Sequence, residues 1–153
     1  MVKSNEHCLF CKLVSGEIPC FKIWEDKDHI AFLDIFPNTR GMTLVIPKKH
    51  FDSYAFSMPD KDYSSLMLAS QKVAKLLEKK IPVKRVALVM EGMGINHAHI
   101  KLYPMHGLKD QYAEMINIDR QFFDKYDGHI STVLGPEADK KELEKLAKLI
   151  RGK

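Results

Sequence analysis

Apolar runs in the first third of the chain predict two neighbouring strands. Residues 23–35 are aromatic and aliphatic between charged turns, and residues 31–35 indicate the strand within this region. Residues 42–46 form a continuous apolar run, which is typical of a central strand that is buried on both faces. Because Arg40 and Gly41 turn the chain between these runs, we expect the two strands to pair antiparallel.

Helical spacing of apolar residues predicts a long helix in the middle of the chain. Ser57 is a candidate N-terminal cap, Pro59 and Asp60 follow it, and the pattern continues to Lys80. The positions expected to face the core are Leu66, Ala69, Val73, Leu76 and Leu77.

Two further helices are predicted toward the C-terminus. Residues 107–128 carry a loosely helical pattern, whereas residues 138–150 place their apolar positions on one stripe. Residues 128–136 lie between them and contain hydroxyls and one histidine between glycines. This segment either returns to a functional site or forms an ordinary loop into the last helix. The stripe of the last helix consists of Leu143, Leu146, Ala147 and Ile150.

Two more strands are predicted on either side of a turn that contains Gly92 and Gly94. Residues 83–90 have the pattern of a second buried strand, and residues 96–103 form a strand that ends at Pro104. Strict alternation in this last strand sends its apolar residues to one face and an exposed basic ladder to the other. The ladder consists of His97, His99 and Lys101, followed by Tyr103.

Composition fits one globular domain of 153 residues, with 45% hydrophobic and 29% charged residues. A net charge of +4 is too small an excess to indicate specific nucleic-acid binding. The polar N-terminus and the lack of a long apolar run predict neither a signal peptide nor a membrane anchor. Three cysteines cannot form a disulfide framework, so we expect a reducing cytoplasm. Cys8 and Cys11 are then metal ligands or a redox pair, and Cys20 is a packing residue.

Four ordered segments of the sequence resemble the histidine-triad (HIT) superfamily of nucleotide-binding hydrolases and transferases. They read CLFCK with GEIP (residues 8–19), AFLDI with a following Pro (31–37), LVIPKKH (44–50) and HAHIKLYP (97–104). The resemblance implies an α+β fold: an antiparallel sheet of about five strands, a long packed helix and a homodimer. We expect residues 1–153 to form a single domain with its core at about 8–104. A C-terminal helical extension then occupies about 107–153.

The catalytic assignment follows from this resemblance. His99 occupies the position of the nucleophile that attacks the α-phosphate of a nucleotide derivative, forming a nucleotidyl-histidine intermediate. The resemblance implies that the backbone carbonyl of Lys101 accepts from the other ring N–H of His99. Lys101 stands where the family has its third histidine, and Met42 stands where the family commonly has another. Lys101 can still offer a positive charge to the phosphate or to the leaving group. Because both histidines are replaced, two functions remain open: an enzyme, or a weakly active or inactive nucleotide-binding module.

Nucleotide contacts are also implied by the resemblance. Asp34 matches the acidic residue that accepts hydrogen bonds from the ribose hydroxyls, although an aspartate here can equally cap a turn. The backbone of Gly94 and the side-chain amide of Asn96 are candidates for holding phosphate, with a plain turn as the alternative. The expected ligand is a purine nucleotide or nucleotide conjugate. The apolar neighbours expected for its base are Phe10, Phe32, Leu33 and Ile35.

A metal site is the second expectation. Cys8, Cys11, His50 and His97 provide two thiolates and two imidazoles, a set that favours closed, structural zinc. A subset of the family carries zinc at these positions. The alternative is a redox pair of Cys8 and Cys11, which predicts a reversible disulfide.

Overall fold

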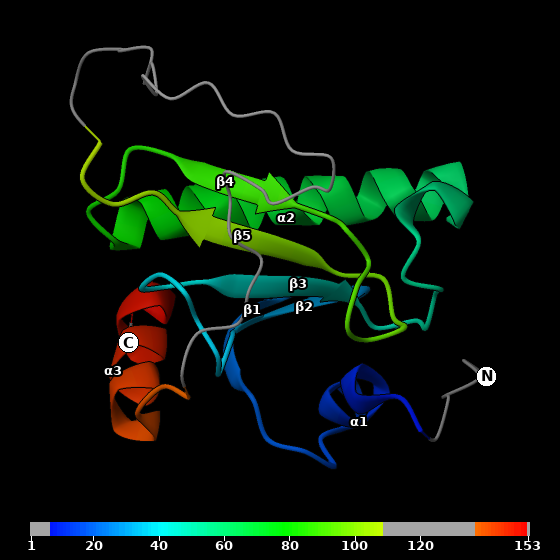
Figure 1. Ribbon diagram of the computed structural model, residues 1–153, viewed down its shortest axis with the longest axis horizontal. Helices are drawn as coiled ribbons and strands as arrows, with labels where there is room; N and C mark the ends of the chain where they lie inside the picture. The colour runs from blue at the N-terminus through cyan, green and yellow to red at the C-terminus, as the bar shows by residue number, and fades with distance from the viewer. Residues whose placement is uncertain (1–6, 109–136, 153) are drawn as a thin grey trace, which may run out of the picture.

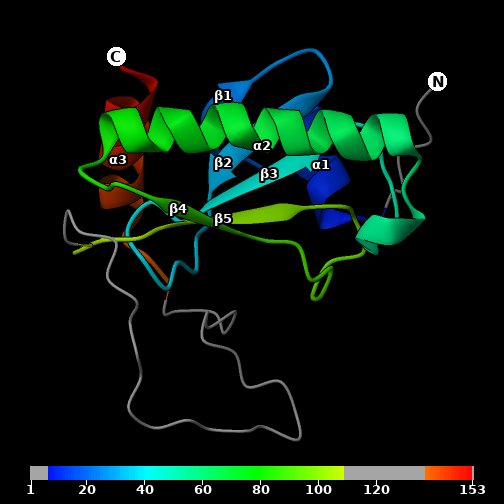
Figure 2. The ribbon, with the colours of Figure 1, turned by 90° about the horizontal axis from the view of Figure 1, so that it is seen from above.

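The computed structural model describes residues 7–108 and 137–152. Its five strands form one antiparallel sheet in the order β1-β2-β3-β5-β4, which confirms the α+β class. The long helix α2 runs along the sheet, and α1 and α3 lie toward its opposite ends (Figure 1, Figure 2). The helices are α1 (Leu9–Ser15), α2 (Asp60–Lys80) and α3 (Lys140–Arg151), with a short 3-10 helix η1 (Ala55–Ser57). The strands are β1 (Phe21–Glu25), β2 (His29–Leu33), β3 (Thr43–Pro47), β4 (Val86–Val89) and β5 (Ile100–Pro104).

Side-chain alternation divides the core between the two faces of the sheet. Ala31 and Leu33 of β2 and Val45 of β3 pack with α2, whereas their neighbours Phe32 and Leu44 pack with α1. Both faces are therefore covered, as the continuous apolar run in β3 predicts. The α2 side holds the larger buried cluster, and the α1 side holds the smaller cluster.

The predicted pairing of the first two apolar runs is confirmed. β2 and β3 are antiparallel neighbours, with Leu33 opposite Thr43. Gly41 has a positive φ of 86°, and a Cβ there would lie 2.5 Å from the Ile81 side chain. Only glycine meets both the backbone and the space requirements at this turn.

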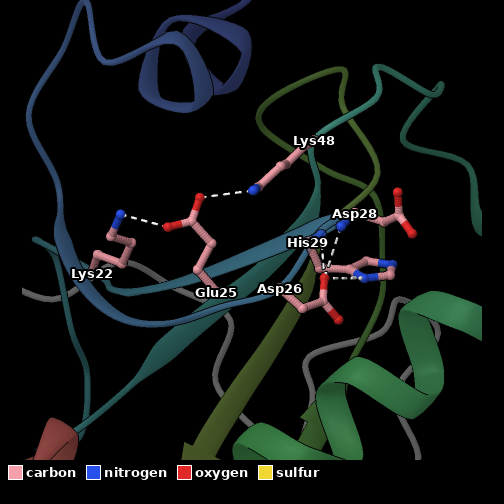
Figure 3. Close-up of polar contacts among 6 residues, drawn as sticks. All are labelled: Lys22, Glu25, Asp26, Asp28, His29 and Lys48. Atoms are coloured by element: carbon pink, nitrogen blue, oxygen red, sulfur yellow. Dashed lines mark hydrogen bonds and ion pairs between the residues drawn. The ribbon is translucent and has the colours of Figure 1, made fainter.

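Residues 23–35 contain two strands with a tight turn between them, a feature that the apolar pattern did not resolve. Asp26 makes the turn, because its Oδ1 accepts hydrogen bonds from the backbone N–H groups of Asp28 and His29 at 2.9 and 2.7 Å. Beside the turn, Glu25 pairs with Lys22 and Lys48 (Figure 3). The strand assigned to residues 31–35 thus ends earlier, at Leu33.

The long helix begins and ends close to its predicted bounds. The proposed cap is wrong: Pro59 occupies the N-cap position without a side-chain hydrogen bond, and Ser57 belongs to η1, where its hydroxyl donates to the Tyr54 carbonyl. Asp60 and Asp62 in the first turn instead complement the helix dipole. Four of the five predicted core positions are fully buried, and Leu76 is partly buried against them.

The last helix is also confirmed. Asp139 caps α3 by accepting a hydrogen bond from the Glu142 N–H. All four residues of the predicted stripe are buried in the α2-side core. The helix expected at 107–128 and the segment 128–136 lie outside the described residues. None of the described helices combines the length and apolarity needed to cross a bilayer.

Two strand predictions need correction. β4 is an edge strand and only half-buried, not a buried central strand, because β5 pairs with it on one side alone. The ladder of His97, His99 and Lys101 is buried, not exposed, because α1 and the segment after β4 cover that face. The regular strand begins at Ile100, after both histidines. Helix α1 is a seven-residue element without a side-chain cap, and the sequence pattern did not predict it.

Candidate active site and metal cluster

A cavity of about 530 Å³ lies on the α1 side of the sheet. Its walls come from α1, the residues that follow α1, strand β2, and the segment between β4 and β5. Most of the lining is apolar. Lys101, Glu91 and Asp34 all act electrostatically on His99, and the part of the cavity that these four residues line is called its polar end. The lining includes Phe10, Phe32, Leu33 and Ile35 on the apolar side, and Asp34, Glu91, His99 and Lys101 at the polar end.

His99 is held in one tautomer at the polar end of the cavity. It is 2% exposed, and its Nδ1 donates a hydrogen bond to the His97 carbonyl at 2.7 Å. The prediction that the Lys101 carbonyl is the acceptor is therefore wrong. The acceptor is the carbonyl of His97, two residues before His99, in a part of the chain that is not yet a regular strand. With Nδ1 donating, Nε2 carries the lone pair that a nucleophile needs.

Burial also tunes the imidazole of His99. Desolvation, together with the charge of Lys101, lowers its pKa below the usual 6.5, which keeps the ring neutral at pH 7. The Phe10 ring lies edge-on to His99 with ring centroids 5.5 Å apart. This apolar contact contributes to the desolvation.

Lys101 is paired with Glu91, a residue to which the sequence reading gave no role. The Lys101 side chain is buried, and its Nζ donates to Glu91 Oε1. The second carboxylate oxygen, Oε2, is buried without a hydrogen-bond partner in the described part of the chain. The register of β4 and β5 places Val89 opposite Lys101, and Glu91 follows two residues later. Pairing the predicted strands at residues 83–90 and 96–103 in the correct register would therefore have identified Glu91 as a neighbour of Lys101.

Asp34 caps a turn and also lines the cavity. It follows β2, lines the cavity, and is 7% exposed. Its Oδ1 caps the turn by accepting a hydrogen bond from the Phe36 N–H at 2.8 Å. Ile35 and Gly94 also line the cavity, and Gly94 has a positive φ of 89°.

Two residues of the expected site lie elsewhere. Asn96 is exposed and is not among the lining residues; its Oδ1 accepts a hydrogen bond from the Ser53 N–H at 2.9 Å. Met42 is buried in the sheet at 2% exposure, and its carbonyl accepts from the Asp34 N–H. Asn96 therefore links its own loop to the loop that contains Ser53. The Met42 carbonyl holds the backbone of Asp34 in place.

The four expected metal ligands form one cluster beside the cavity. Their ligand atoms all lie within 4.8 Å of one another. Cys8 Sγ lies 3.4 Å from His97 Nδ1, Cys11 Sγ lies 3.4 Å from His50 Nδ1, and the two histidine Nδ1 atoms are 3.2 Å apart. Tetrahedral zinc with ordinary bond lengths has S···N edges of about 3.6 Å and N···N edges of about 3.3 Å. These three separations are close to the edges of a tetrahedral zinc site, so the four residues fit such a site.

A further contact orients His97 toward this cluster. Its Nε2 donates to the Pro47 carbonyl at 2.9 Å, which leaves Nδ1 unprotonated and available as a ligand. Burial lowers the pKa of His97 to about 4, so the ring is neutral at pH 7. The same residue holds His99 through its backbone carbonyl, and the Phe10 ring lies against both imidazoles. His97 and Phe10 therefore link the metal cluster to the cavity through direct contacts with His99.

Comparisons with known proteins agree with this architecture. The HIT domain family matches residues 15–108. An uncharacterised HIT-like protein of Methanocaldococcus jannaschii is 34% identical over 120 residues, covering 73% of this chain and 92% of that protein. An adenosine 5'-monophosphoramidase of Candida albicans is 33% identical over 110 residues, covering 66% and 72%. A Zn-bound histidine triad family protein of Mycobacterium smegmatis superimposes with a TM-score of 0.68 at 25% identity, covering 95% and 91%. The chain therefore belongs to the HIT domain family.

Proposed function

We propose that this protein is a nucleotide hydrolase or nucleotidyl transferase that acts at the α-phosphate of a nucleotide conjugate. The observation that carries the proposal is the buried, neutral His99, whose fixed tautomer leaves Nε2 free at the polar end of the cavity. Dinucleoside polyphosphates, nucleoside phosphoramidates and adenylylated compounds all present an α-phosphate to such a group. Family membership and the named activity of the Candida albicans relative support the same class.

The proposed reaction has two steps. His99 Nε2 forms a bond to the α-phosphorus as the bond to the leaving group breaks, and the leaving atom takes a proton from the Lys101 ammonium. Water then attacks the nucleotidyl-histidine, the P–N bond to His99 breaks, and a proton of that water returns to Lys101. Before it donates that proton, the charge of Lys101 also stabilises the negative charge on the phosphate oxygens.

Binding contacts extend from the same end of the cavity. Asp34 has a second carboxylate oxygen for the ribose hydroxyls, while Ile35, Phe10 and the neighbouring apolar side chains accept a purine base. We propose that the backbone N–H of Gly94 contacts phosphate. For Asn96 to do so, its hydrogen bond to Ser53 has to be exchanged.

We infer that Cys8, Cys11, His50 and His97 hold one structural zinc ion. Zinc here supplies no chemistry to the substrate; it ties α1 and the end of β3 to the segment that carries His99. A reversible disulfide of Cys8 and Cys11 is the competing use of these thiols. One tightly bound zinc per chain, measured by elemental analysis, supports the metal site, and a metal-free protein with a redox-active disulfide would exclude it.

We also propose a homodimer in the cytoplasm. The half-buried edge strand β4, with Leu88 at 40% exposure, offers a surface for a second copy. Light scattering is expected to give about twice the chain mass of 17.6 kDa, and a monomer would refute the dimer. Cell fractionation tests the location.

The enzyme is distinguished from its rival, a nucleotide-binding module without turnover, by the variant His99→Ala. We expect the unmodified protein to release nucleoside monophosphate and the variant to bind nucleotide without releasing any. The resemblance implies that Lys101 stands where the family has its third histidine and Met42 where the family commonly has another, and these two changes favour the rival. If the unmodified protein binds nucleotide but releases no product from any of the three substrate classes, the binding module is the correct function.

A further inference from the structure

Glu91 lies at the polar end of the cavity, although it belongs to no sequence motif of the expected site. It lines the cavity together with His99 and Lys101. Its Oε1 accepts from the Lys101 ammonium, and the two side chains are 24% and 11% exposed. The cation at this end of the cavity is therefore neutralised before any substrate arrives.

The remaining charge around the cavity is acidic. Among the described residues that line it, the charged side chains are Asp34, Glu91 and Lys101. Two carboxylates thus face one ammonium. A substrate with several phosphate charges finds no unpaired cation in this part of the wall, and repulsion between like charges in a partly buried site is costly.

The geometry of the ion pair leaves one acceptor unused. Glu91 Oε2 is buried and has no hydrogen-bond partner within the described residues. A buried carboxylate oxygen without a donor is unfavourable and uncommon in folded proteins. A ligand that brings an N–H group to this end of the cavity would remove that cost, after a small rotation of the Glu91 side chain.

We propose that Glu91 determines leaving-group specificity: it favours nucleotide conjugates whose leaving group is an amine and disfavours those whose leaving group is a polyphosphate. This inference rests on the proposed function, because it assumes that the α-phosphate lies at His99. An amine leaving group places N–H donors beside the carboxylate, whereas a polyphosphate places anionic oxygens there. Lys101 alone, without Glu91, would favour the anionic leaving group.

Binding in a His99→Ala background tests the rule without requiring turnover. The two ligands are an adenosine phosphoramidate with a primary-amine leaving group and diadenosine tetraphosphate, and their dissociation constants are measured by calorimetry. Adding Glu91→Gln removes the charge while keeping the shape. We expect the ratio of the two affinities to move at least about tenfold toward the tetraphosphate.

Two controls separate charge from structure. Glu91→Asp keeps the carboxylate and is expected to keep the preference for the phosphoramidate. Glu78→Gln removes the same charge from an exposed position on α2, on the opposite side of the sheet, and is expected to leave both affinities unchanged. An equal change in both affinities with Glu91→Gln, or the same ratio shift with Glu78→Gln, would overturn the proposal.

Failure of the inference and failure of the proposed function give different results. If the unmodified protein turns over neither substrate but Glu91→Gln still shifts the affinity ratio, the proposed reaction is wrong and the charge rule holds. If turnover is observed and the affinity ratio is insensitive to Glu91→Gln, the reaction stands and Glu91 only positions Lys101.

Discussion

The metal cluster and the cavity each contain one of two histidines that lie two residues apart in the sequence. The two sites differ in how many of their polar atoms have partners. In the cluster, His97 has both ring nitrogens engaged: Nε2 by the Pro47 carbonyl and Nδ1 by the neighbouring ligand atoms. In the cavity, within residues 7–108 and 137–152, the hydrogen bond of His99 is made by Nδ1, and Glu91 uses Oε1 while Oε2 has no partner. A closed set of partners is suited to structure, whereas unused acceptors beside a cavity are suited to chemistry.

Removal of the proposed zinc is expected to have the largest effect, because His97 of the metal cluster also holds His99 in the cavity. Chelation or Cys11→Ser is expected to lower the free energy of unfolding by about 3 kcal/mol or more, since the buried ligands then lack their common partner. Chemical denaturation with and without added zinc measures this change. Cys20→Ser is the matched control, because Cys20 lies outside the cluster. Equal stability with and without zinc would contradict the structural role of the cluster.

Loss of the cation in the cavity is expected to affect rate more than fold. Lys101→Met should lower kcat by about 10²-fold, because it removes both the positive charge beside the phosphate and the proton source for the leaving group. Steady-state kinetics measures the change, and Lys101→Arg is expected to restore the charge but not the proton donation. A Lys101→Met enzyme with unchanged kcat would show that Lys101 has no part in the reaction.

The segment between β4 and β5, which forms part of the cavity wall, is expected to be sensitive at Gly92. This residue has a positive φ of 71°, and a Cβ would lie 2.5 Å from the Ser53 carbonyl oxygen. Gly92→Ala should therefore cost about 2 kcal/mol of stability and displace Glu91 beside it. Gly107→Ala shares the positive φ but has nothing within 4 Å, so thermal denaturation should show a smaller loss. Equal losses would show that the close approach to Ser53 is unimportant.

The smallest predicted effect concerns pH. Because burial lowers the pKa of His99 below 6.5, the neutral, nucleophilic form persists as the pH falls toward that lowered pKa. The acidic limb of kcat/KM is therefore expected below pH 6.5. A limb at or above pH 6.5 would mean that the ring is not desolvated in the working enzyme.

The sequence predicted the cluster better than the cavity for a physical reason. The four ligands have distinctive chemistry, and the resemblance to the HIT family assigns them to one site without knowledge of strand pairing. The role of Glu91 was not predicted, because only the register of β4 and β5 shows that Glu91 lies near Lys101. The acceptor for His99 was misassigned because the chain is irregular before Ile100. Helix α1 was missed because it is short, has no side-chain cap at its N-terminus, and buries only Phe10 and Cys11.

The most direct test of the central claim is to trap the nucleotidyl intermediate and locate it. The protein is mixed with an adenosine phosphoramidate, quenched rapidly and analysed by intact-mass spectrometry and peptide mapping. The account predicts a mass gain of one nucleoside monophosphate on the peptide that contains His99, and no gain in His99→Ala. Product formation without any such adduct in the unmodified protein, or an adduct that persists in His99→Ala, would contradict it.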